Sequence, residues 1–425
     1  MSASPEAPIR RLPAPGSADP GSAGHADLRW PVVAIMAVFF AHGLLFASWT
    51  AHIPETKASL DLSAGTLGLA LLAAPIGSVL AMLAAGWLVP RLGSRRMVRV
   101  TLVGYAAAGP VVGLCGSVAA FFVAFLVWGA FQGALDVSMN AQAIAVERRS
   151  RQPRMPGFHG GWSLGSLVGA LVGALGVGVG LALDTQLLIL AVPVLVVVGW
   201  LTTRLVPDSH PTAVPTGSMT GTPPGPPSGT PAAAPGDRSR RFGVLCPAVV
   251  VLGLVALADM LCEGVAADWA AVYFRDSLRT TAFVAGSAYV VYLVAMTICR
   301  LSGNRLVGWL RSGRLVPGLL VVGGAGFAVG LAVDRPWAVL AGFGLLGAGL
   351  ALVVPTAFTA AGAIPGVPAG RAVAAVSAFG WVGFVAGPPL IGLLASASSL
   401  RVALVVVPVL VGVLVVATAV ALRSD

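Results

Sequence analysis

Thr222-Pro-Pro-Gly-Pro-Pro-Ser-Gly229 lies near the middle of this 425-residue chain and separates two long apolar regions. The surrounding stretch, 207–243, is rich in proline, glycine and threonine and offers little to bury, so we predict a flexible linker there. The flanking regions consist of apolar runs of about 20 residues, the length that a bilayer-spanning helix needs. The linker therefore divides the chain into two bundles of membrane helices.

Six apolar runs precede the linker and six follow it. We predict an all-α integral membrane protein with twelve transmembrane helices in two six-helix pseudo-symmetric bundles. The predicted domains are a disordered cytoplasmic tail at 1–29, a bundle at 30–206, the linker at 207–243 and a second bundle at 244–425. The predicted spans are 30–52, 66–89, 97–117, 119–146, 158–181, 185–205, 244–273, 281–302, 315–333, 337–361, 371–395 and 401–422.

Hydrophobic residues make up 57% of the chain and charged residues only 10%. Soluble globular proteins contain about 25% charged residues, so this composition excludes an ordinary soluble enzyme and indicates a lipid bilayer as the surroundings. A formal charge of +10 would indicate nucleic acid in a soluble protein. Here the basic residues lie in short loops between apolar runs, where they set topology, and we expect no nucleic-acid partner.

The basic residues also predict an orientation. With a cytoplasmic N-terminus, the inside segments hold 21 of the 26 lysines and arginines, and the outside holds only Lys57, Arg275, Arg279, Arg335 and Arg401. This asymmetry favours both termini and the linker on the cytoplasmic side of a bacterial plasma membrane. The first 28 residues have no apolar core before Trp30, so we expect a tail rather than a cleaved signal peptide.

The two halves share a pattern at a constant offset of 219 residues. Gly161-Trp162 with Gly173 matches Gly380-Trp381 with Gly392. This correspondence favours two parallel repeats around a central pathway. The alternative is that both halves use the same glycine spacing for helix packing.

The segment Gly86-Trp-Leu-Val-Pro-Arg91-Leu-Gly93-Ser-Arg95-Arg96 resembles the glycine-to-basic motif between the second and third helices of the major facilitator superfamily. Pro90 stands where the family usually has an acidic residue. The resemblance implies secondary transport and a gating loop that acts in conformational switching, and we expect its glycines to permit close helix approach. The residues of this gating loop are Gly86, Arg91, Gly93, Arg95 and Arg96.

Four further segments resemble the fucose-permease-like branch of that superfamily, including its uncharacterised bacterial inner-membrane members. They are Gly43-Leu-Leu-Phe-Ala-Ser-Trp49, Asp136-Val-Ser-Met-Asn140, Pro156-Gly-Phe-His159-Gly-Gly-Trp162-Ser-Leu-Gly165 and Glu263-Gly-Val-Ala-Ala-Asp268-Trp269. This resemblance implies a small polar solute that is moved by alternating access, often together with protons.

Ionisable side chains within apolar spans are costly, so they are functional candidates. The candidates for proton coupling are Asp136, Glu263, Asp259, His42 and His159. Gln132 and Asn140 lie four residues before and after Asp136 and form one polar stripe with it, which indicates solute binding. The alternative for the stripe is a structural network of hydrogen bonds between helices.

Aromatic side chains at helical spacing are candidates for contact with a sugar-like or amphipathic solute. They are Phe46, Trp49, Trp162, Tyr289, Tyr292 and Trp381. Plain packing is the alternative for each of them. The four cysteines, Cys115, Cys246, Cys262 and Cys299, show no CxxC spacing, so we expect no metal site.

The sequence contains no GxxxxGK[ST] loop and no protease or nucleophile-elbow motif, so we expect no ATP-driven pump, no enzyme, no catalytic residue and no cofactor. Our leading interpretation is a monomeric secondary transporter that takes up a polar, sugar-like metabolite with protons. Proton-antiport efflux of a drug-like or secreted compound is the alternative, because Gly383-Phe-Val-Ala-Gly387-Pro388-Pro389 resembles an antiporter motif. A membrane-embedded sensor or enzyme is a second alternative.

Overall fold

The computed structural model describes residues 28–150, 154–207, 246–365, 367 and 369–421. Nearly all of the predicted tail at 1–29 and of the predicted linker at 207–243 lies outside these residues, so both remain predictions. The described part is helical, without a β-strand in it. This agrees with the predicted all-α class.

The N-terminal half contains helices α1 to α9. Two of the predicted spans in this half are interrupted or irregular: the second comprises α3 and α4, and the sixth passes through a π-helical turn at Val194–Val198. The bounds are α1 Arg29–Thr50, α2 Ile53–Ser59, α3 Ala64–Leu71, α4 Ala73–Leu92, α5 Ser94–Gly113, α6 Val118–Ser150, α7 Met155–Gly178, α8 Leu183–Pro193 and α9 Gly199–Leu201, followed by a 3₁₀ turn at Thr202–Arg204.

The C-terminal half contains helices α10 to α16. Helix α11 includes two candidate membrane spans, Ala282–Ser302 and Arg314–Val333, and the predicted tenth span is divided into α12 and α13. The bounds are α10 Pro247–Val272 with a π-helical turn at Tyr273–Ser277, α11 Ala282–Val333, α12 Pro336–Leu350, α13 Val353–Gly362, α14 Ala369–Ala397, α15 Leu400–Leu404 and α16 Val406–Ala421.

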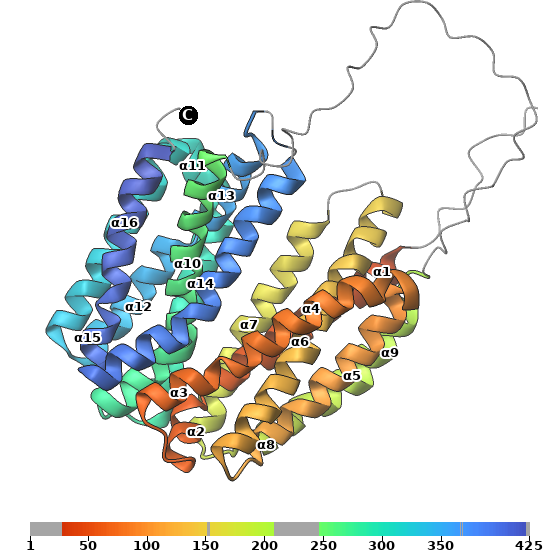
Figure 1. Ribbon diagram of the computed structural model, residues 1–425, viewed down its shortest axis with the longest axis horizontal. Helices are drawn as coiled ribbons and strands as arrows, with labels where there is room; N and C mark the ends of the chain where they lie inside the picture. The colour runs from red at the N-terminus through yellow and green to blue at the C-terminus, as the bar shows by residue number, and fades with distance from the viewer. Residues whose placement is uncertain (1–27, 151–153, 208–245, 366, 368, 422–425) are drawn as a thin grey trace, which may run out of the picture.

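Figure 1 shows the helices of the two halves as two bundles side by side, which approach each other near α2, α3 and α15 and diverge toward the other end. Within the described residues, eleven segments are long and apolar enough to cross a membrane. Helix α5 completes the predicted twelve, since it packs lengthwise between α6 and α8. Arg95, Arg96 and Arg99 in its first turns lower its hydropathy.

Glycines allow α1 and α7 to approach until their backbones touch. A Cβ added at Gly169 would meet the carbonyl oxygen of Leu44, and Gly165 and Gly173 make the same kind of contact one turn before and after it. Such small-residue stripes permit close van der Waals packing where no hydrophobic driving force exists between helices. The glycine spacing seen in the sequence therefore has a packing function in this half.

The C-terminal half uses the same device at the equivalent place. Helix α14 packs along α10, and a Cβ at Gly383 would meet the Leu257 carbonyl oxygen. Gly387, within the segment that resembles an antiporter motif, also faces α10, at Leu261. Close helix packing therefore accounts for the glycines of that segment.

We expect Gly169→Val to destabilise the protein by about 1–3 kcal/mol or more, because the new side chain must displace the backbone of α1. Thermal unfolding of the purified protein in detergent measures this. Gly412→Val is the matched control, since a Cβ at Gly412 in α16 meets no atom within 4 Å. Equal melting temperatures for the two variants would contradict the proposed role of the stripe.

Candidate functional site

The two halves contact each other at one end of the molecule, which we name the Lys57 face; we name the opposite end the Arg95 face. Near the Lys57 face, α3 packs against α14 and α7 packs against α11. Gly68 and Gly392 meet there so closely that a Cβ on either would touch the backbone of the other helix. The contact between the halves is thus made of small residues and admits no large solute in this conformation.

One ion pair links the halves at the Lys57 face. The Nζ atom of Lys57 lies 2.5 Å from Oδ2 of Asp276, and both side chains are partly exposed, at 22% and 38%. The two residues are 219 positions apart, which is the offset of the repeat. At the repeat offset found in the sequence, opposite charges therefore stand in the two halves and pair with each other.

Glu55 lies beside this ion pair, in the same short helix as Lys57. Burial raises the pKa of Glu55, and the charge of Asp276 adds to the effect while that of Arg275 opposes it. In this conformation the surroundings of Glu55 therefore favour its protonated form.

The polar stripe of α6 has the predicted arrangement. Gln132, Asp136 and Asn140 are all half-buried on one side of the helix. The Asn140 amide donates to the Asp136 backbone carbonyl at 2.8 Å and to Asp136 Oδ1 at 3.3 Å. The side-chain hydrogen bonds described for this stripe stay within α6, and the His42 ring of α1 interacts with the backbone carbonyl of Gln132.

His42 and Trp162 are brought together, whereas His159 is not. The Trp162 indole donates to His42 Nδ1 at 2.8 Å, and the Tyr105 ring stacks on the imidazole. Because an indole N–H can only donate, Nδ1 must accept, and the neutral His42 ring carries its proton on Nε2 and interacts with the backbone carbonyl of Gln132 in α6. His159 is exposed near the start of α7 and contacts the edge of the Phe39 ring.

The predicted acids of α10 face tyrosines of α11. Asp259 is fully buried, and in the described part of the chain neither of its carboxyl oxygens has a hydrogen-bond partner. Glu263, one turn further along, is half-buried. Tyr292 is also fully buried with an unpartnered hydroxyl, and it interacts electrostatically with both acids. Tyr289 stacks on Tyr292 with 5.8 Å between the ring centroids.

Arg300 in α11 satisfies a carbonyl group that a proline has set free. A continuous helix would bond the Ala351 carbonyl to the N–H of residue 355, but Pro355 has no N–H and the helix is interrupted between α12 and α13. The Nε atom of Arg300 donates to this carbonyl at 3.1 Å. The guanidinium of Arg300 therefore extends from α11 to the interruption between α12 and α13 and stabilises it.

The aromatic candidates fall into two groups. Phe46 of α1 meets Phe384 of α14 across the two halves at 6.5 Å, and Trp381 contacts Phe384 edge-on at 5.9 Å. Trp49 is only 1% exposed and packs against Phe121 of α6. The first group lies where the halves meet, whereas the position of Trp49 favours a packing role.

The glycines of the gating loop have other roles than we expected. Gly93, between α4 and α5, has a φ of +83°, a conformation that side chains with a Cβ rarely adopt. A Cβ at Gly86 would meet nothing within 4 Å. The expectation of close helix approach is therefore wrong for Gly86 in this conformation, and Gly93 permits the turn between α4 and α5.

The arginines of the gating loop contact their own half. Arg91 donates to the Trp87 carbonyl at 2.7 Å, and Arg95 donates to the Thr203 carbonyl, at the end of the predicted sixth span, at 2.5 Å. Arg96 is exposed. The loop thus caps the end of a neighbouring helical segment at the Arg95 face.

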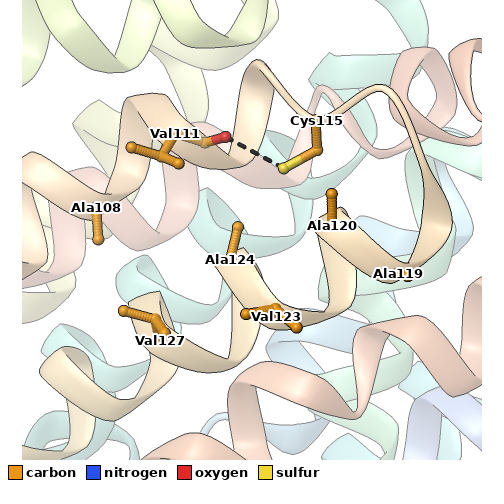
Figure 2. A pocket seen from close by; sticks show the side chains of 8 residues that line it. All are labelled: Ala108, Val111, Cys115, Ala119, Ala120, Val123, Ala124 and Val127. Atoms are coloured by element: carbon orange, nitrogen blue, oxygen red, sulfur yellow. Dashed lines mark hydrogen bonds between the residues drawn. The ribbon is translucent and has the colours of Figure 1, made fainter.

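An apolar pocket between α5 and α6 is a poor candidate for solute binding. Figure 2 shows its lining by small apolar side chains and Cys115, whose thiol donates back to the Val111 carbonyl. A solute site needs some polar groups to orient the ligand, and this lining presents almost none.

Sequence reasoning missed two features of this region. Arg300 is close to the end of its predicted span, and its position in the sequence does not indicate that its long side chain reaches the Ala351 carbonyl. The pairing of Lys57 with Asp276 had a signal, because adding the repeat offset of 219 to Lys57 gives a residue of opposite charge.

We expect Arg300→Met to cost about 1–3 kcal/mol of unfolding free energy, because it leaves the Ala351 carbonyl without a donor. Pro355→Ala restores an N–H at the position that normally bonds this carbonyl. In the Pro355→Ala background, Arg300→Met should therefore cost clearly less. Thermal unfolding of the four proteins forms a double-mutant cycle, and an equal cost of Arg300→Met in both backgrounds would exclude this function of Arg300.

Comparison with known proteins identifies the family. The sequence profile described as the Major Facilitator Superfamily matches residues 32–367. The chain is 34% identical over 371 residues to an uncharacterized MFS-type transporter of Yersinia pestis, covering 87% of this chain and 90% of that protein. It is 29% identical over 387 residues to the membrane protein MosC of Rhizobium meliloti, covering 90% and 88%.

Solved structures agree in fold. The nucleoside transporter NupG has a TM-score of 0.65 at 11% identity, covering 93% of this chain and 99% of that chain. A bacterial homolog to the human lysosomal transporter Spinster, inward-facing and occupied, has a TM-score of 0.65 at 14% identity, covering 93% and 96%. The twelve-helix fold and the function as a membrane transporter rather than an enzyme follow from these matches: the chain belongs to the major facilitator superfamily.

Proposed function

We propose that this transporter takes up a small polar, sugar-like solute together with protons, as a monomer in a bacterial plasma membrane. The observation that carries the proposal is the placement of one half-buried carboxyl group in each half, Asp136 in α6 and Glu263 in α10. Within the described residues no basic nitrogen lies within 4.0 Å of either. An acid that has no permanent counter-charge inside a membrane span can alternate between protonated and ionised forms as access changes.

The amides and aromatic rings near these acids support solute binding between the halves. Gln132 and Asn140 supply hydrogen-bonding groups beside Asp136, and Phe46 and Trp381 supply apolar faces of the kind that sugar rings stack on. The fucose-permease-like segments agree with this reading. The antiporter-like glycines of α14 are accounted for by packing on α10, so they do not favour the efflux alternative.

We further propose that the Lys57 face is the outer face, as the distribution of basic residues predicts. The chain would then be closed to the outside, in a conformation comparable with that of the inward-facing Spinster homolog. The arginines of the gating loop at the Arg95 face would exchange their carbonyl partners when the conformation changes. The loop would therefore affect the transport rate of every solute to a similar degree.

Lys57→Glu should open the Lys57 face, because it replaces attraction by repulsion at the contact between the halves. A partly exposed pair contributes about 0.2–1 kcal/mol, so the populations should shift by roughly 1.4- to 5-fold. Distances between spin labels at Ser59 and Ser277, one in each half, measure the opening in a variant without the native cysteines. The double variant Lys57→Glu/Asp276→Lys should return to the wild-type distances. Failure of the charge swap to restore closure would contradict the role of the pair.

Asp136→Asn and Glu263→Gln keep the shape of each side chain and remove its titration. At least one of them should abolish solute accumulation driven by a pH gradient in proteoliposomes, while exchange of labelled for unlabelled solute continues. Asp61→Asn, which removes an exposed acid, is the control. Full gradient-driven accumulation in both variants would exclude both acids from coupling, and gradient-driven expulsion by the wild type would establish the efflux alternative.

A further inference from the structure

The membrane-embedded part of this protein carries an excess of acid. Away from the ends of the candidate spans, the described residues include four carboxyl groups, Asp136, Asp259, Glu263 and Asp268, whereas Arg300, which interacts electrostatically with Asp259, lies near the end of its span, Ala282–Ser302. Arg300 is engaged through Nε by the Ala351 carbonyl and lies more than 4.0 Å from any carboxylate oxygen of the described acids. The region between the halves is therefore an environment that attracts cations and repels anions.

The cluster of Asp259, Glu263 and Tyr292 contains unsatisfied acceptors. Asp259 is 0% exposed, and both of its oxygens lack a donor among the described residues. The Tyr292 hydroxyl, also fully buried and unpartnered, is close enough to interact with Asp259 and Glu263. Buried polar atoms without partners cost free energy, so this cluster is incomplete without a ligand that brings several donors.

Aromatic rings surround the acids. Tyr289 and Tyr292 stack on each other and both interact electrostatically with Glu263. Phe384 of α14 lies beside Gly264, the residue after Glu263, and contacts Trp381 as well as Phe46 of the other half. Carboxylates combined with aromatic faces bind organic cations, since the ring quadrupole and the negative charge attract the same ligand.

We propose that the transported solute carries a protonated amine, so that it is an amino-bearing polar molecule rather than a neutral or acidic sugar. An ammonium group offers three donors and no acceptor, which matches the unsatisfied atoms of the Asp259–Glu263–Tyr292 cluster. The polar remainder of the solute would bond to the amides of Gln132 and Asn140. This inference rests on the proposed transport function and specifies its substrate class.

The test uses the purified full-length protein and sets of matched compounds in which an ammonium group is replaced by a hydroxyl or a carboxylate. D-glucosamine, D-glucose and D-glucuronate form one set; ethanolamine, ethylene glycol and glycolate form another. Apparent affinities come from thermal stabilisation over a range of concentrations. A charge-assisted hydrogen bond contributes about 1.5–3 kcal/mol, so the ammonium members should bind about tenfold or more tightly than the hydroxyl members, and the carboxylates should not bind.

Glu263→Gln should remove the preference for the ammonium member and change binding of the hydroxyl member by less than about threefold, because only the charge is lost. Asp61→Asn should change neither. Stronger binding of hydroxyl or carboxylate members, an undiminished ammonium preference in Glu263→Gln, or no stabilisation by any set would overturn the inference. Accumulation of neutral solutes driven by a pH gradient would overturn the inference and leave the proposed function standing. Amine binding without any gradient-driven accumulation would support the inference and contradict the proposed proton-coupled uptake.

Discussion

Inside a bilayer no water is available to satisfy backbone or charged groups, and the rest of this structure depends on that constraint. Where α12 ends, Pro355 frees the Ala351 carbonyl, and Arg300 comes from a neighbouring helix to bond it. Where α1 and α7 cross, glycines remove side chains so that the backbones themselves make the contact. Both features have the same cause: helices in a bilayer gain little from hydrophobic association, so close packing and a few polar contacts must hold them together.

The repeat of 219 residues connects packing with conformational change. Two extensive helix pairings, α1 with α7 in one half and α10 with α14 in the other, both rely on glycines. The contact between the halves uses the same symmetry with opposite charges, because Lys57 and Asp276 are equivalent residues. The bundles are therefore internally rigid, whereas the contact between them is a partly exposed ion pair and a set of small residues that can separate at low cost.

Apolar length and charge asymmetry were sufficient to predict the twelve helices and their division into two bundles, because both follow from the thickness and dielectric of the membrane. The interruptions at Leu72 and Ala351 were not predicted, because the apolar composition of a segment does not indicate whether its backbone hydrogen bonds continue without a break. The stripe of Gln132, Asp136 and Asn140 followed from helical periodicity alone. The partner of Arg300 could not be found in this way, because it depends on how α11 and α12 pack and on the reach of a flexible side chain.

The structure also distinguishes between the two kinds of titratable group that the sequence offers for proton transfer. His42 is bonded through Nδ1 by an indole that can only donate, so a second proton on that nitrogen would break the bond and place two N–H groups against each other. No described basic group constrains Asp136 or Glu263 within 4.0 Å in this way, and each is half-buried rather than enclosed. A group that gains and loses a proton in each transport cycle must be accessible to a proton donor or acceptor in both its protonated and its deprotonated form. The half-buried carboxyl groups therefore remain candidates for proton coupling, whereas His42 would have to break its hydrogen bond with the Trp162 indole to accept a second proton.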